Sequence, residues 1–155
     1  MGIHIRDATP ADQQTIAEFN SRMAEETEGK RLDPALVGPG VAAVLHEPAK
    51  GRFWLAEIEG EIAGQIMVAY EWSDWRNGML WWIESVYVPS QFRRLGVFSA
   101  LYQHVESLCK ADTEACGLRL CVEKDNLRAQ QTYESLGMSK PGYIVMESFF
   151  STGES

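Results

Sequence analysis

The sequence predicts an α/β fold, of the α+β kind, in which a mixed, mostly antiparallel central sheet is flanked by helices on both faces. Turn-linked strand patterns dominate the first half of the chain, whereas strand and helix patterns alternate in the second half. Residues 79–88 form a long run that is apolar on both faces, as in a strand buried at the centre of a sheet. These three observations carry the fold prediction.

Length and composition indicate one globular domain, predicted to span residues 1–155. The apolar fraction of 45% and the charged fraction of 23% are ordinary for a soluble protein. A formal charge of −8 argues against a nucleic-acid partner, which requires a basic surface, and is compatible with a cationic one. No apolar run approaches the ~20 residues of a membrane helix, and the N-terminus lacks the build of a secretion signal. We therefore expect a cytoplasmic protein without a membrane partner.

The cysteines and histidines indicate neither disulfides nor a metal site. Cys109, Cys116 and Cys121 are odd in number and form no CxxC pair, which favours reduced thiols. Of these, Cys109 and Cys121 are expected in the core. Metal-ligand spacing is also missing among the three histidines, which are His4, His46 and His104.

The opening segment predicts two helices. The first begins near Thr9-Pro10, with Thr9 as N-cap and Pro10 at the first helical position. Its apolar residues recur at helical spacing: Ile16, Phe19 and Met23. The second helix begins near Asp33-Pro34. Gly38-Pro39-Gly40 interrupts its pattern, so one helix and two short pieces both remain open.

Three strands follow, and turns join them. Residues 53–58 and 61–71 are rich in apolar side chains and flank Glu59-Gly60, which predicts a hairpin. Asn77-Gly78 supplies positive φ at a tight turn and leads into the central strand, residues 79–88.

The second half predicts a helix over 97–111, a short strand over 118–122 and a helix over 126–136. Gly137 ends this last helix as a C-cap. A final strand, residues 143–150, is expected to close the domain.

The passage from the central strand into the next helix is the first candidate site. A buried strand ends, the basic loop Arg93-Arg94-Leu95-Gly96 follows, and a helix begins at Val97. The first amides of a helix have no intrahelical partners and lie at the positive end of its dipole, so they can bind a phosphate or pyrophosphate. Taken alone, this pattern leaves two interpretations open: an anion site, or a solvated arginine pair before a helix.

A second motif favours the anion site. The loop of the GNAT acetyltransferases reads Arg/Gln-x-x-Gly-x-Gly/Ala, and residues 93–98 follow it except at Phe98. The later helix of that family reads Asn-x-x-Ala-x-x-x-Tyr-x-x-x-Gly-Phe, which is matched by Asn126, Ala129, Tyr133 and Gly137, with Met138 in place of Phe. With both motifs in the family's order and spacing, the chain resembles the GNAT family over nearly its whole length.

The resemblance implies acetyl-CoA as co-substrate and roles for named residues. Backbone groups of the strand end would pair with the pantetheine arm, the loop amides would hold the pyrophosphate, and Asn126 would contact the cofactor. The implied cofactor-binding residues are Val86, Tyr87, Val88, Arg93, Arg94, Leu95, Gly96, Val97, Phe98, Ser99 and Asn126. Phe98 departs from the small residue of the family, so its ring must turn onto the core for the amide to remain usable. Arg94 replaces a frequent glycine and would add a phosphate contact.

Two residues are candidates for catalysis. Glu84 interrupts an apolar strand, where an unpaired buried carboxylate would be costly, so it should face a cleft or be paired. The resemblance implies that Glu84 is the general base, directly or through water, and that Tyr133 protonates the departing thiolate. The alternatives are a Glu84 that pairs with a core arginine or caps a backbone irregularity, a Tyr133 that only packs, and an Asn126 that only caps its helix.

The implied reaction is transfer of an acetyl group to a primary amine of a small molecule or peptide, by direct attack in a ternary complex. A strand amide near Val86 would steady the developing oxyanion. The alternatives are a non-catalytic acyl-CoA-binding or sensing domain of the same fold and a structural module without a ligand. The acidic residues 25–28 fit a solvated helix end or part of an acceptor cleft, and Trp72 and Trp75 fit an acceptor pocket or a homodimer contact.

Overall fold

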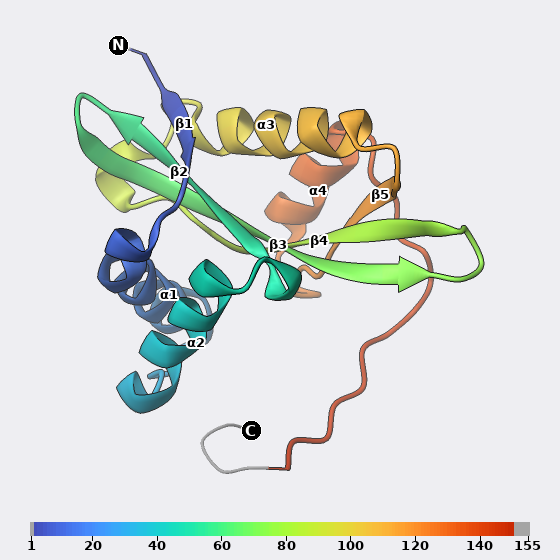
Figure 1. The fold of residues 1–155 in the computed structure, drawn as a ribbon, viewed down its shortest axis with the longest axis horizontal. Coiled ribbons are helices and arrows are strands. Elements are labelled where there is room, and N and C mark those ends of the chain that lie inside the picture. The colour runs from blue at the N-terminus through green and yellow to red at the C-terminus, as the bar shows by residue number, and fades with distance from the viewer. Residues whose placement is uncertain (1, 151–155) are drawn as a thin grey trace. The chain divides into compact units, whose positions relative to one another are not determined.

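The computed structural model describes residues 2–150 (Figure 1). The chain forms two compact units, unit 1 up to Leu120 and unit 2 from Cys121 onward, and each is described by itself.

Unit 1 is built on a five-stranded sheet with the strand order β1-β2-β3-β4-β5. Its strands are β1 (His4–Asp7), β2 (Arg52–Ile58), β3 (Glu61–Ser73), β4 (Gly78–Tyr87) and β5 (Ala115–Leu120). The first three neighbouring pairs are antiparallel and β4 pairs with β5 in parallel, which confirms the predicted mixed, mostly antiparallel sheet. The sequence analysis missed β1, a strand of 4 residues whose burial is only partial.

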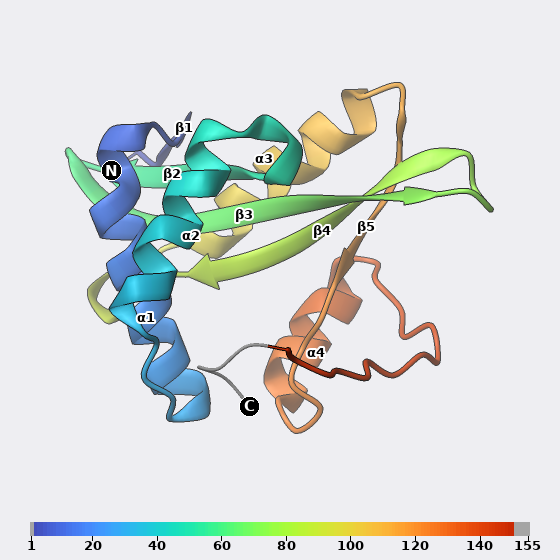
Figure 2. The same cartoon turned by 60° about the horizontal axis from the view of Figure 1, so that its bottom comes forward.

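Helices cover both faces of this sheet (Figures 1 and 2). Helices α1 (Gln13–Glu28) and α2 (Pro34–His46) lie on one face, and α3 (Val97–Ala111) lies on the other. Short 3-10 turns precede α1, β2 and α3: η1 (Pro10–Asp12), η2 (Pro48–Lys50) and η3 (Ser90–Phe92). The open question about the second helix is settled, since α2 is one continuous helix with Pro39 inside it.

Each face of the sheet buries its own apolar cluster. Ile16 of α1 and Val41 of α2 pack on Phe53 and Leu55, and Met67 lies against this cluster. The ring of Trp54 points the other way, toward His104 of α3, with ring centroids 6.1 Å apart. Side chains alternate between the two faces along a strand, so Phe53 and Leu55 of β2 face α1 and α2, while Trp54 between them faces α3.

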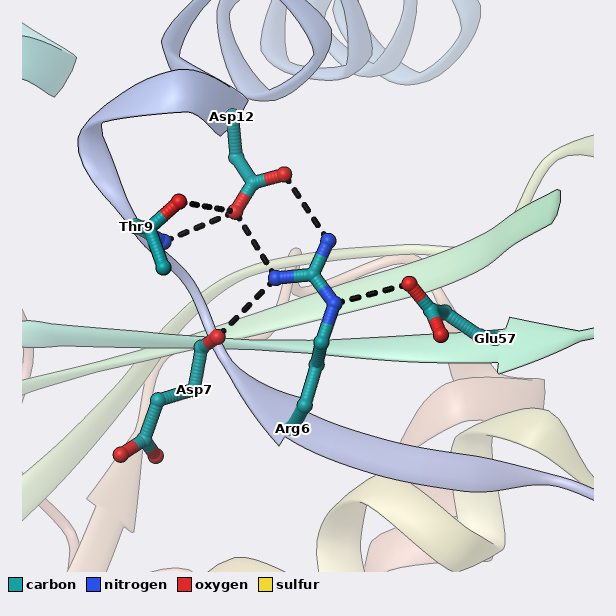
Figure 3. A network of polar contacts seen from close by, with 5 residues as sticks. All are labelled: Arg6, Asp7, Thr9, Asp12 and Glu57. Atoms are coloured by element: carbon teal, nitrogen blue, oxygen red, sulfur yellow. Dashed lines mark hydrogen bonds and ion pairs between the residues drawn. The ribbon is translucent and has the colours of Figure 1, made fainter. Parts of the chain in front are cut away.

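The junction between β1 and α1 is held by one arginine (Figure 3). Arg6 donates to both carboxylate oxygens of Asp12 at 2.9 Å and to Glu57 of β2 at 2.8 Å. Asp12 also accepts from the Thr9 amide at 2.8 Å, so the residues around the expected N-cap are tied together. The hydrogen bond from Arg6 lowers the pKa of Asp12, and burial opposes this shift only in part.

Unit 2 contains the helix α4 (Leu127–Ser135), for which Asn126 is the N-cap. Two expectations fail beside it. Residues 143–150 form no strand, and their apolar side chains are exposed, up to 98% for Phe150. High β-propensity does not make a strand unless a neighbouring strand accepts its hydrogen bonds. Cys121 follows the end of β5 and is exposed, whereas Cys109 is buried on α3 as expected.

Candidate functional site

The end of β4 has an open backbone edge. The parallel ladder to β5 runs from Met79 to Ile83, where Ile83 pairs with Leu120, and stops there. Within the described part of unit 1, the remainder of β4, from Glu84 to Tyr87, pairs only with β3. Backbone groups on the other edge of this stretch can therefore pair with an extended, amide-bearing ligand, as an added strand would. This stretch includes Val86 and Tyr87 of the expected cofactor set, and Val88 follows directly.

A β-bulge lies within this open stretch. Met67 pairs with Glu84 and Gln65 pairs with Tyr87, so two residues of β4, Ser85 and Val86, lie opposite one residue of β3. Ser85 has a φ of 52°, in the left-handed region that serine rarely adopts. Such bulges bend a strand and redirect the neighbouring side chains and amides.

The predicted phosphate loop forms a helix N-terminus with usable amides. Gly96, with a φ of 86°, is the N-cap of α3, and the helical ladder starts where the Ala100 amide donates to the Gly96 carbonyl at 3.0 Å. The amides of Val97, Phe98 and Ser99 precede that bond and have no intrahelical acceptor. Apart from Gly96 itself and its two chain neighbours, no heavy atom of residues 2–150 lies within 4 Å of a Cβ placed on Gly96, so the space beside this residue is open.

The Phe98 ring, which was expected to turn onto the core, lies along α3. It is half-buried and lies against Tyr102, one turn further along α3, with centroids 6.0 Å apart and planes tilted by 43°. Its departure from the family pattern therefore leaves the first amides of α3 in place. Beneath them, Val97 is 1% exposed and anchors the helix on β3.

The two loop arginines have different environments. Arg93 donates from Nη2 to Glu26 of α1 at 2.7 Å and from Nε to the Val88 carbonyl at 2.8 Å. Tyr87 also donates to Glu26, at 2.6 Å. These bonds commit the Arg93 guanidinium to α1 and leave its amide for a ligand. By contrast, the exposed side chain of Arg94 makes no ion pair with any residue between 2 and 150.

Glu26 is the member of the acidic segment 25–28 with a specific role in the fold. The hydrogen bond from Tyr87 and then that from Arg93 lower the pKa of Glu26. Burial, followed by the bond to Glu26, raises the pKa of Tyr87. Both shifts keep Glu26 ionised and Tyr87 protonated near neutral pH, so the contact between α1 and the end of β4 persists there.

Glu84 lies beside the bulge on the α1 and α2 face of the sheet. Its register with Met67, which packs on that face, fixes this orientation. The side chain is exposed, and within the described chain it forms no hydrogen bond or ion pair. Pairing with a core arginine, one of the alternatives, is therefore not what the structure contains.

Unit 2 carries the two remaining candidates. The Asn126 side chain accepts from the Ala129 amide at 3.1 Å, which is the ordinary role of an N-cap. Tyr133 on α4 is half-buried, and burial raises the pKa of its phenol. Tyr133 is therefore protonated at neutral pH and can donate a proton.

Sequence reasoning missed two residues that shape the site. Gln65 in β3 is 0% exposed, and its side chain bonds to the bulge. Gly64 lies where a Cβ would come within 2.8 Å of Val97 at the start of α3. For Gln65 the available signal was the one that singled out Glu84: a polar residue within an apolar strand.

Other features of the described chain lie apart from this site. A hollow of about 480 Å³ beside the start of α1, lined by residues such as Gln13 and Gly38, carries amides and no charged side chain. In residues 2–150, no group of acidic, histidine and cysteine side chains is arranged to hold a metal ion. None of the helices in that range has the length and apolar character to cross a membrane.

Comparison with known proteins assigns the family. A model of the acetyltransferase (GNAT) family matches residues 14–138. The chain is 36% identical over 105 residues to phosphinothricin N-acetyltransferase of Streptomyces viridochromogenes, a match that covers 66% of this chain and 56% of the relative. It is 31% identical over 111 residues to an N-alpha-acetyltransferase of Sulfurisphaera tokodaii, covering 68% and 65%. The match thus spans less than two thirds of each relative.

A solved structure gives a closer match. The structure of a possible acetyltransferase from Clostridium difficile 630 is 43% identical, with a TM-score of 0.90 and coverage of 97% of this chain and 99% of that one. The open strand end, the helix N-terminus at Gly96 and these matches agree with one another, and the chain belongs to the GNAT family of acetyltransferases.

Proposed function

We propose that the protein is an acetyl-CoA-dependent N-acetyltransferase that acts on a primary amine of a small molecule or peptide. One observation carries the proposal: the open edge of β4 leads to a helix N-terminus whose first amides have no intrahelical acceptor. An extended amide chain that ends in a pyrophosphate has the chemistry to use both features. Three free cysteines fit the reducing cytoplasm in which we propose that it works.

The residues of unit 1 provide a binding surface for acetyl-CoA. Amides of Val97, Phe98 and Ser99 would hold the pyrophosphate, and the exposed Arg94 would add a charge. Backbone groups near Val86 would pair with the pantetheine arm. We also propose a CoA contact for the Asn126 side chain, which caps α4. This binding set requires no metal.

Glu84 and Tyr133 would handle the two protons of the reaction. Glu84, which is exposed and has no ion-pair partner among residues 2–150, would take a proton from the ammonium group directly or through water, which frees the nitrogen lone pair. The nitrogen then attacks the thioester carbonyl carbon, and the Val86 amide would stabilise the oxyanion. As the carbon–sulfur bond breaks, Tyr133 would give its proton to the thiolate, and the second proton that the nitrogen loses on becoming an amide would restore the tyrosine phenol. No acyl-enzyme forms in this ternary-complex route.

The names of the curated relatives support an amine acceptor and leave its size open. One relative is named for phosphinothricin, and the other for an α-nitrogen. The net charge of −8 supports a cationic acceptor.

Thiol release from acetyl-CoA across a panel of small amines and peptides tests this proposal. Wild-type protein should release CoA thiol only when an amine is present. Glu84→Gln and Tyr133→Phe should each lower kcat by about 10²-fold or more and leave the Kd of CoA within about twofold. Glu61→Gln, which neutralises an exposed carboxylate at the start of β3, is the matched control and should retain full turnover.

Two results would count against the proposal. Normal CoA binding without turnover on any amine would favour a non-catalytic acyl-CoA-binding domain. The absence of any CoA-dependent rise in Tm would favour a module without this ligand.

A further inference from the structure

Gln65 is a polar side chain fully buried in the sheet. It is 0% exposed, and its Nε2 donates to the Ser85 carbonyl at 3.0 Å and to Asn20 Oδ1 of α1 at 2.8 Å. Its other polar atom, Oε1, is buried and has no hydrogen-bond partner among the described residues.

The orientation of the Gln65 amide follows from its partner on β4. A backbone carbonyl can only accept, so the nitrogen of the side-chain amide must face Ser85. Turning the amide over would place two oxygens against each other and would not give Oε1 a donor there. The unpartnered Oε1 is therefore a consequence of holding the Ser85 carbonyl, and it costs stability.

What Gln65 holds is the strained point of the site. Ser85 is the bulged residue with a φ of 52°, which a non-glycine residue keeps only when its surroundings impose it. Glu84 precedes it and Val86 follows it. The direction of the proposed base and that of the proposed oxyanion amide both depend on the conformation of this one residue.

We infer that Gln65 is a positioning residue of the acetyl-transfer site. By donating to the Ser85 carbonyl it fixes the bulge, and with it the directions of the Glu84 carboxylate and the Val86 amide. Its second bond, to Asn20, joins the bulge to α1. Gln65 is buried behind Ser85, so it acts through the strand and does not touch the reactants. The inference rests on the proposed function, since it is the proposed chemistry that gives Glu84 and Val86 their roles.

Gln65→Met in the full chain is the sharpest test. Methionine matches glutamine in length and volume, removes both donors, and removes the unpartnered oxygen as well. We expect a Tm equal to or above that of the wild type, a Kd for CoA within about twofold, and a kcat at least about 10-fold lower. Any preference of the wild type for acetyl-CoA over CoA should also decrease.

A second variant separates the two hydrogen bonds. Asn20→Leu removes the acceptor on α1 and leaves the bond to Ser85, so its kcat should decrease less than that of Gln65→Met. An equal or larger decrease would place the important contact on α1 and overturn the inference. A kcat for Gln65→Met within twofold of the wild type, or a parallel loss of Tm and CoA binding, would show that Gln65 is only structural.

A crystal structure of Gln65→Met provides a readout that needs no substrate. We expect Ser85 to leave the left-handed region in the variant and to keep it in the wild type. A variant in which Ser85 keeps its φ near that of the wild type would overturn the inference. If the wild type transfers acetyl to no amine, the proposed function fails, and the Ser85 conformation still decides whether Gln65 holds the bulge.

Discussion

Two polar residues within apolar strands, Glu84 and Gln65, have opposite environments. Glu84 is exposed and has no partner in the described chain, whereas Gln65 is completely buried and donates two hydrogen bonds. An ordinary hydrogen bond contributes a net gain in stability of roughly 0.5–1.5 kcal/mol. A gain of this size does not explain why a buried oxygen of Gln65 is left without a donor. Glu84 and Gln65 are both connected to the bulge at Ser85. This shared connection points to function as the reason why each strand carries a polar residue there.

A double-mutant cycle should give the two loop arginines different coupling free energies to Glu26. Arg93 bonds to Glu26, and both side chains are nearly half exposed, so we expect a coupling free energy of about 0.2–1 kcal/mol between Arg93→Gln and Glu26→Gln. Arg94→Gln should show no coupling to Glu26→Gln. Unfolding by urea measures these free energies.

Arg93→Gln and Arg94→Gln should also differ in their effect on CoA binding. Arg94→Gln should weaken CoA about three- to tenfold at low salt, and the difference should shrink as salt screens the charge. Equal coupling of both arginines to Glu26, or a salt-independent effect of Arg94→Gln, would contradict the assignment.

At the scale of elements, β3 positions the start of α3. Gly64 lets the first turn of α3 lie directly on the strand, since a Cβ there would stand 2.8 Å from Val97 Cγ1 and 3.3 Å from Leu101 Cδ1. The open edge of β4 and the helix amides therefore belong to one packed arrangement, in which a small change in β3 reaches the phosphate loop.

Gly64→Ala should displace the N-terminus of α3. We expect a loss of about 1–3 kcal/mol in the free energy of unfolding and weaker CoA binding, because the added methyl overpacks Val97. Adding Val97→Ala should restore part of both losses by making room. Gly117→Ala in β5 is the matched control, since its Cβ would meet Leu80 at an ordinary 3.5 Å. An unchanged Kd for CoA in Gly64→Ala would argue against this coupling.

The junction of β1 and α1 should give a pH-dependent contribution to stability. Arg6 lowers the pKa of Asp12 in the folded protein, below its ordinary value of 3.8. At this site the folded state therefore binds fewer protons than the unfolded state. The contribution is complete above about pH 4 and is lost as the pH falls through the lower folded pKa.

Asp12→Asn should reveal this contribution. At neutral pH the variant should be less stable than the wild type by about 1–3 kcal/mol, and the gap should close in strong acid, where Asp12 is protonated. Urea unfolding across pH 2 to 7 measures the gap. A gap that is constant over this range would mean that the Arg6 bonds do not set the Asp12 pKa.

At the scale of the whole molecule, the sequence predicted the elements whose signals are local. Helix α3 has the predicted bounds, 97–111, because its apolar stripe is unbroken, and β4 differs from its prediction by one residue at each end. The family resemblance correctly anticipated the family and its fold. Segment 143–150 has an equally strong apolar pattern and forms no strand, because a strand exists only with a partner.

Long-range register accounts for what the sequence did not predict. The bulge at Ser85 exists only in the pairing of β4 with β3, and no local pattern encodes which residue of β3 lies opposite it. The roles of Gln65 and Gly64 follow from that pairing and from the packing of α3. The different environments of Arg93 and Arg94 likewise depend on Glu26, which lies 67 residues away from Arg93 in sequence.

The central claim is that the open edge of β4 and the N-terminus of α3 form one acetyl-CoA site. A crystal structure of the protein with CoA tests it most directly. We predict that the pyrophosphate accepts from the amides of Val97, Phe98 and Ser99, while the pantetheine arm pairs with the backbone near Val86 and brings the thiol toward Glu84. A CoA molecule bound elsewhere, with these amides facing solvent, would contradict the claim.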